Sequence, residues 1–162
     1  MEHQFDTRIV WTGNVGQGTR TYRGYERTWE VAVAGRAPIL CSNDPRLGGD
    51  PKKMNPEDML LSALSACHML WYLHLASDAG IIVESYEDSP VGHAESDPSG
   101  AGRFTSAVLR PQIGVALNTD LARADAIHHE IGKVCFIARS VAFPINYQAT
   151  YKVVSQSGGE TA

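Results

Sequence analysis

The sequence predicts an α+β domain, in which strand segments alternate with two helices. Three observations indicate this fold class. Short segments rich in Thr, Val, Ile, Tyr and Trp are separated by turns that contain Gly and Pro. One long apolar segment opens with residues that favour a helix start, and a second segment carries apolar residues at helical spacing. We expect a single domain over residues 1–162, because this length and a hydrophobic fraction of 43% suffice for one buried core.

The N-terminal part of the chain predicts strands and a long loop. Strands are expected at residues 7–12 and 20–34. The glycine-rich segment 13–18 is interpreted as a turn. A phosphate-binding loop is disfavoured there, because neither a helix nor Gly-Lys-Ser/Thr follows it. Residues 35–54 contain three Pro and three Gly and predict a long irregular loop, and loops of this length are often functional.

The first helix is expected to run from residue 56 to residue 79. Asn55 suits the cap and Pro56 the first helical position, while Gly80 suits the stop. The helix is apolar on all sides, which predicts burial on all sides and favours a dimer. A membrane span is discounted, because polar side chains lie around every face and no basic segment follows.

Further strands and a second helix follow. Residues 81–88, 91–97 and 103–117 predict three strands. The second helix is expected to start near residue 118 and to end before Phe143-Pro144, because residues that precede proline avoid the α region. Its buried face carries apolar residues at helical spacing: Ile127, Ile131, Val134, Cys135 and Ala138. Residues 145–154 predict a last strand, and residues 155–162 predict a disordered tail.

Composition and charge narrow the function classes. The net charge is −4, which argues against nucleic acid or an anionic membrane as the main partner. The first residues contain neither a basic nor an apolar region typical of a secretory signal, so we expect a cytoplasmic protein. Three cysteines, an odd number, do not fit a disulfide framework and raise the question of a reactive thiol.

The cysteines have two interpretations. Cys67 lies in the middle of the first predicted helix and Cys135 on the buried face of the second, so both suit small core residues. Two helices packed across a core could also bring the two sulfur atoms together. Cys41 lies in the predicted loop without an obvious partner, and we regard it as incidental.

A reactive Cys67 would need a cation nearby, because burial in mid-helix raises the pKa of a thiol. Glu57 is ten residues before Cys67, about 15 Å along a helix. An arginine held by Glu57 would therefore have to bridge that distance or come from a second chain. The candidate cations are Arg20, Arg23, Arg46, Lys52 and Lys53.

The motifs resemble a known family. Asn55-Pro56-Glu57 opens a helix that reads SACHMLWYLHLASDAGI, and a later segment reads HHEIGKVCFIARSVAFPINY. Together with Trp11-Thr12-Gly13, these segments are similar to the OsmC/Ohr family, the osmotically inducible and organic-hydroperoxide-resistance thiol peroxidases. The resemblance covers essentially the whole chain. It implies an OsmC-like fold with antiparallel sheets, a long buried central helix that carries one cysteine, a second helix that carries the other, and an intertwined homodimer.

The resemblance also implies a metal-free chemistry without a cofactor. Cys67 would be the thiolate that attacks an organic hydroperoxide and becomes a sulfenic acid. Cys135 would resolve it as a disulfide, which an external lipoyl- or thioredoxin-type dithiol would reduce. Arg46, held by Glu57, would stabilise the thiolate and the charge on the leaving oxygen.

Three features depart from the best-known peroxidases of that family. Phe136 follows the second cysteine where those proteins have proline, and His68 follows Cys67 where they have an aromatic residue. The spacing of the loop around Arg46 also differs, so Arg20 or Arg23 could serve instead. These departures predict a divergent branch.

Three alternatives remain open. The first is a metal site, whose ligands would come from Cys67, His68, His128, His129 and Cys135. It is disfavoured because adjacent histidines on a helix face different directions. The second, a Cys-His acyl-transfer enzyme, lacks a recognisable nucleophile elbow. The third is a dimeric small-ligand-binding protein whose cysteines only pack in the core.

Overall fold

The computed structural model describes residues 2–154, and the chain divides into two compact units, residues 1–60 and 61–162. The predicted α+β class is confirmed, and the predicted tail lies outside the described residues. The helices are α1 (Pro56–Asp78), α2 (Leu121–Ile131) and two short 3-10 helices, η1 (Pro45–Leu47) and η2 (Ala138–Ser140). The strands are β1 (Arg8–Trp11), β2 (Thr28–Ala32), β3 (Ile39–Ser42), β4 (Val83–Asp88), β5 (Val91–Ser96), β6 (Gly102–Leu109), β7 (Pro111–Ala116), β8 (Ile145–Tyr147) and β9 (Thr150–Val154).

The first unit is built on an antiparallel sheet in the order β1-β2-β3. The strand predicted over residues 20–34 is wrong for residues 20–27, which form turns. The loop predicted over residues 35–54 is wrong for β3, which pairs with β2, and for η1. The glycine-rich segment is a turn, as expected: the Asn14 side chain accepts hydrogen bonds from the backbone of Gly16 and Gly18.

The predicted start and stop of α1 are confirmed in detail. The Asn55 side chain accepts a hydrogen bond from the Asp58 backbone at 2.8 Å, and the Asp58 carboxylate accepts one from the Asn55 backbone at 3.2 Å. This reciprocal capping satisfies amides at the helix start that have no partner within the helix. At the other end Gly80 has φ +73°, and Ile81 N–H donates to Ala76 O at 2.8 Å, which closes a Schellman motif.

Only one stripe of α1 is buried within the chain. Its buried residues recur at every fourth position: Leu64, His68, Tyr72 and Ala76. Burial on all sides, for which a dimer was expected to help, stays a prediction, since in the single chain Leu70 on another face is 62% exposed. By length and composition alone α1 could also cross a membrane, a property that it shares with core helices of soluble proteins.

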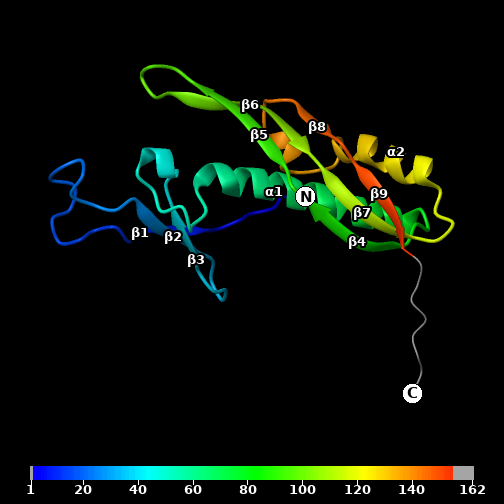
Figure 1. Cartoon of the computed structure of the whole chain (residues 1–162). Helices are drawn as coiled ribbons and strands as arrows, with labels where there is room; N and C mark the ends of the chain where they lie inside the picture. The colour runs from blue at the N-terminus through cyan, green and yellow to red at the C-terminus, as the bar shows by residue number, and fades with distance from the viewer. Residues whose placement is uncertain (1, 155–162) are drawn as a thin grey trace. The chain divides into compact units, whose positions relative to one another are not determined.

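The second unit contains two three-stranded sheets, in the orders β4-β7-β9 and β5-β6-β8. The strand predicted over residues 103–117 breaks at Arg110 into β6 and β7, and the one predicted over residues 145–154 breaks into β8 and β9. β8 runs parallel to β6 and β9 parallel to β7, so the expected antiparallel sheets are in fact mixed (Figure 1). Gln148 lies between β8 and β9, and Leu109 is the last residue before the break between β6 and β7. The Gln148 N–H donates to Leu109 O at 2.8 Å, so one hydrogen bond connects the two breaks.

The second helix is shorter than predicted. α2 is capped by the Asp120 carboxylate, which accepts from the Arg123 backbone, and it ends at Ile131. Cys135 therefore lies in the turn after α2 and not on the helix, because Gly132 follows the last helical residue and the chain tightens there. The Cys135 backbone still donates to Ile131 O at 2.9 Å, and its side chain is fully buried.

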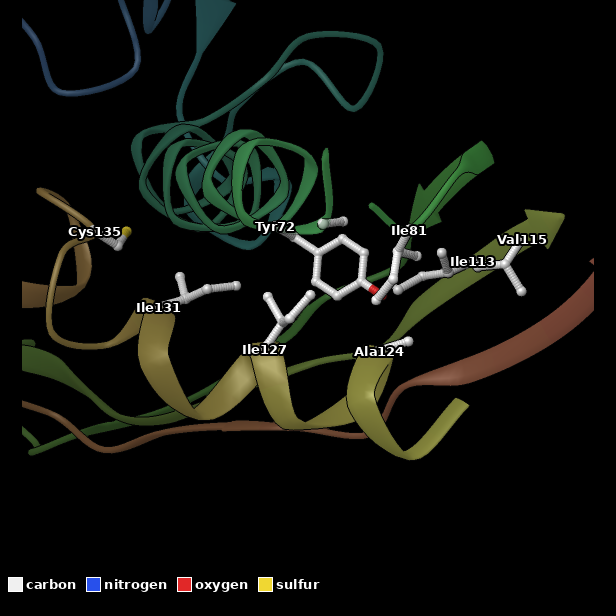
Figure 2. Packing of buried hydrophobic residues seen from close by; sticks show 9 residues of the cluster. Tyr72, Ile81, Ile113, Val115, Ala124, Ile127, Ile131 and Cys135 are labelled. Atoms are coloured by element: carbon white, nitrogen blue, oxygen red, sulfur yellow. The ribbon is translucent and has the colours of Figure 1, made fainter. Parts of the chain in front are cut away.

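The main core of the second unit lies between α1, α2 and the strands. Tyr72 reaches from α1 toward Ile127 on α2, and Cys135 belongs to the same cluster (Figure 2). The buried members of this cluster are Tyr72, Ala76, Ile81, Ile113, Val115, Ala124, Ile127, Ile131 and Cys135. A smaller cluster of Leu64, Ala107 and Leu109 packs nearby in the same unit.

Candidate functional site

Cys67 and Cys135 meet in the core of the second unit. Cys67 on α1 is partly buried and packs against the cluster that contains Cys135. Both thiols are free. Burial, and then a hydrogen bond with Cys67, raises the pKa of the Cys135 thiol to about 11. Cys135 is fully buried whereas Cys67 is partly exposed, so Cys67 is the better placed of the two to meet a substrate.

The third cysteine belongs to the first unit. Cys41 on β3 is fully buried, and its thiol lies 3.6 Å from the Ile39 carbonyl oxygen and 3.8 Å from the sulfur of Met59. Burial raises the pKa of this thiol. These contacts give Cys41 a packing role within its own unit.

Arg46 is paired with a different carboxylate from the expected one. Its Nη2 lies 2.7 Å from Asp44 Oδ2 and its Nε donates to Asp44 Oδ1 at 3.0 Å. This pairing lowers the pKa of Asp44 to about 2. Asp44 caps η1, which brings its carboxylate to Arg46. Among the described residues no ion pair joins Arg46 to Glu57, which acts on Arg46 only through its charge, so the expected Arg46–Glu57 pair is not formed in this structure.

Another arginine of the first unit was not anticipated. The Arg27 guanidinium lies over the rings of Tyr22 and Tyr25, 4.6 Å and 5.0 Å from their centroids, and donates to the Tyr22 carbonyl at 3.0 Å. The feature of the sequence that could have indicated this contact is the alternation of basic and aromatic residues in the segment around Arg27. Of the two alternatives named above, Arg20 donates to Gln17 at 3.1 Å and Arg23 is exposed.

A buried pair of histidines lies between α1 and α2. His68 Nε2 and His128 Nδ1 are 2.7 Å apart, and His128 Nε2 is 3.1 Å from the Tyr151 hydroxyl. Burial lowers the pKa of His68 to about 4 and that of His128 to about 3, so both rings are neutral at pH 7. The seven-residue spacing between His128 and Cys135 in the sequence predicts that they lie on the same side of the second helix. The hydrogen bond between His128 and His68 depends on how the two helices pack and could not be predicted in that way.

The histidine pair and Cys135 share one cavity of about 370 Å³. Tyr147, whose hydroxyl is 2.8 Å from His129 Nε2, forms part of its wall. The described residues that line it are Leu64, His68, Leu109, His128, His129, Ile131, Gly132, Cys135, Ala138, Phe143, Ile145, Asn146 and Tyr147. None of these is Asp, Glu, Lys or Arg.

The hypothetical metal site finds no support in the geometry. Within residues 2–154 no group of three or more His, Cys, Asp or Glu side chains is arranged to hold a metal ion. His68 and His128 instead bond to each other.

Comparisons with known proteins agree with this fold. The family model described as OsmC-like protein matches residues 49–149. An OsmC-like protein of unknown function from Vibrio cholerae is similar in structure, with a TM-score of 0.83 and 28% identity over 92% of this chain and 100% of that chain. An OsmC-like protein from Mycoplasma pneumoniae gives a TM-score of 0.70 at 17% identity, covering 93% of this chain and 99% of that chain. An organic hydroperoxide resistance protein from Legionella pneumophila gives 0.64 at 16% identity, covering 94% of this chain and 100% of that chain. A search of the curated proteins finds no significant match.

Proposed function

This chain belongs to the OsmC-like protein family, and on that premise we propose that it is a cysteine-based thiol peroxidase that reduces organic hydroperoxides to alcohols. Similar structures include organic hydroperoxide resistance proteins. The observation that carries the proposal is the contact between a partly buried Cys67 and a fully buried Cys135.

The difference between the two thiols assigns their roles. The Cys67 thiolate attacks the distal oxygen of the hydroperoxide, the O–O bond breaks, and the alkoxide leaves as the alcohol after taking up a proton. Cys67 is then a sulfenic acid. The fully buried Cys135 attacks that sulfur, water leaves, and a Cys67–Cys135 disulfide forms. An external dithiol returns both thiols by exchange.

A homodimer completes the proposal. On α1 the apolar side chains of Ala63, Ala66 and Leu70 are exposed in the single chain, Leu70 at 62%, and a second copy would cover them. The same assembly could supply the cation that Cys67 needs from a partner chain.

The proposal is tested by counting thiols. We expect reduced protein to lose two of its three thiols and two hydrogens within seconds of adding one equivalent of cumene hydroperoxide. Intact mass and a free-thiol assay measure this change. If all three thiols survive in folded protein, the proposal fails and the alternative of a small-ligand-binding protein with structural cysteines replaces it.

The site arginine is tested by three matched variants. We expect Arg46→Ala to slow the first oxidation of Cys67 by about tenfold or more, because the variant lacks the cation that stabilises the thiolate. A tenfold slower rate corresponds to an activation free energy that is higher by about 1.4 kcal/mol. Stopped-flow kinetics of a single oxidation measures it. Arg20→Ala and Arg23→Ala serve as comparisons. If Arg46→Ala slows oxidation by less than threefold and Arg20→Ala or Arg23→Ala slows it more, Arg46 is the wrong arginine.

A further inference from the structure

We propose that the cavity beside Cys135 binds an uncharged aromatic compound of one or two fused rings. This goes beyond the proposed peroxidase, because the described lining residues include Cys135 and His68 but not Cys67. The cavity lies wholly within the second unit.

Size and layout suit such an occupant. At about 370 Å³ the cavity is within the range of small-molecule sites and is more than twice the roughly 150 Å³ that accepts benzene in an apolar cavity. Its lining combines partly buried apolar side chains, such as Phe143 and Ile145, with the exposed polar residues His129 and Asn146. A ring would rest on the partly buried apolar side chains, with a hydroxyl toward the polar ones.

Aromatic rings line part of the wall. The His128 ring is stacked with those of Tyr72 and Tyr147, at centroid distances of 4.6 Å and 4.7 Å, so its own faces are occupied. The rings that remain for an occupant are those of Tyr147 and Phe143, which are only partly buried. Aromatic ligands pack favourably against such rings by offset or edge contacts.

Charge argues for a neutral occupant. The lining contains no Asp, Glu, Lys or Arg, and the buried His68–His128 pair satisfies its facing nitrogens internally. A charged ligand would lose its hydration without gaining a counter-charge, which is costly. The same ring without a charge avoids that cost.

The test compares two ligands with one ring system. We expect calorimetric titration of the reduced protein at pH 7 to show saturable binding of 2-naphthol, one per chain, and at least tenfold weaker binding of 2-naphthoate. No peroxide is added, so the result is independent of the peroxidase reaction. Absent binding of 2-naphthol, or equal affinity for both compounds, would overturn the proposal.

A pair of tryptophan variants locates the site. Gly132 lines the cavity, and a Cβ added there would meet no atom within 4 Å, so Gly132→Trp has open space to fill. We expect it to weaken 2-naphthol binding at least tenfold, while Ala126→Trp on an exposed position of α2 leaves it unchanged. Equal binding by both variants contradicts the assignment. Chemical-shift changes in the unaltered protein, expected at residues 128–135 and 143–147, locate the site even if Gly132→Trp does not fold.

Discussion

Cys67→Ser is expected to abolish hydroperoxide consumption. A serine hydroxyl is not ionised at neutral pH and cannot replace the thiolate, so the rate is expected to fall by about three orders of magnitude or more. The measurement is cumene hydroperoxide consumption in the presence of a dithiol such as dihydrolipoamide. Unchanged consumption by Cys67→Ser would exclude Cys67 as the reacting group.

The other two cysteines supply the controls. Cys135→Ser is expected to consume one equivalent of hydroperoxide and then to hold Cys67 as a sulfenic acid, which dimedone labels with a defined mass. Cys41→Ala is expected to retain full turnover, because Cys41 packs against Met59 within the first unit, whereas Cys67 and Cys135 belong to the second. A loss of turnover in folded Cys41→Ala would show that the two-cysteine scheme is incomplete.

Acid is expected to destabilise the protein through the His68–His128 pair. Both folded pKa values, about 4 and about 3, lie below the ordinary value of 6.5. The unfolded chain therefore binds more protons between these values, and the stability present above pH 6.5 is lost as the pH falls toward 4. Two protons taken up on unfolding correspond to at most about 2.7 kcal/mol per pH unit. Urea unfolding at several pH values between 7 and 4.5 measures this slope.

Histidine substitutions separate this effect from general acid denaturation. We expect the slope to flatten in the double variant His68→Leu/His128→Leu and to persist in His93→Leu, where the histidine is exposed on β5. If the double variant keeps the full slope, the pair is not its source. Histidine ring resonances of the unaltered protein give a second measurement, since neither ring of the pair should titrate above pH 5.

The parts of the fold that local chemistry determines were predictable. The start and stop of α1 follow from Asn55, Asp58 and Gly80, whose backbone contacts are made within a few residues. The break at Arg110 carried a signal in Pro111, because proline argues against one continuous strand. The break at Gln148 was not predictable, because the alternating pattern continues across it while the chain passes between two sheets. The end of α2 was missed for a related reason: apolar spacing continues through Val134 and Cys135 after the helix has ended.

The candidate site, like the fold, could be predicted only in part from the sequence. The two cysteines of interest could be selected from the sequence and the resemblance, while their contact depends on how α1 and the turn after α2 pack. Arg46 could be named, but its pairing with Asp44 depends on the cap of η1. The bond between His68 and His128 joins residues far apart in the chain, and no single-sequence pattern encodes such a partner.

The parallel pairing of β8 with β6 and of β9 with β7 has a consequence for how the second unit folds. One short C-terminal segment supplies the last strand of both sheets, and its partners are distant in the sequence. Such non-local contacts require costly loop closure and slow the folding rate. Because β9 also carries Tyr151, whose hydroxyl contacts His128, the docking of this one segment completes both sheets and places Tyr151 beside the buried histidine pair.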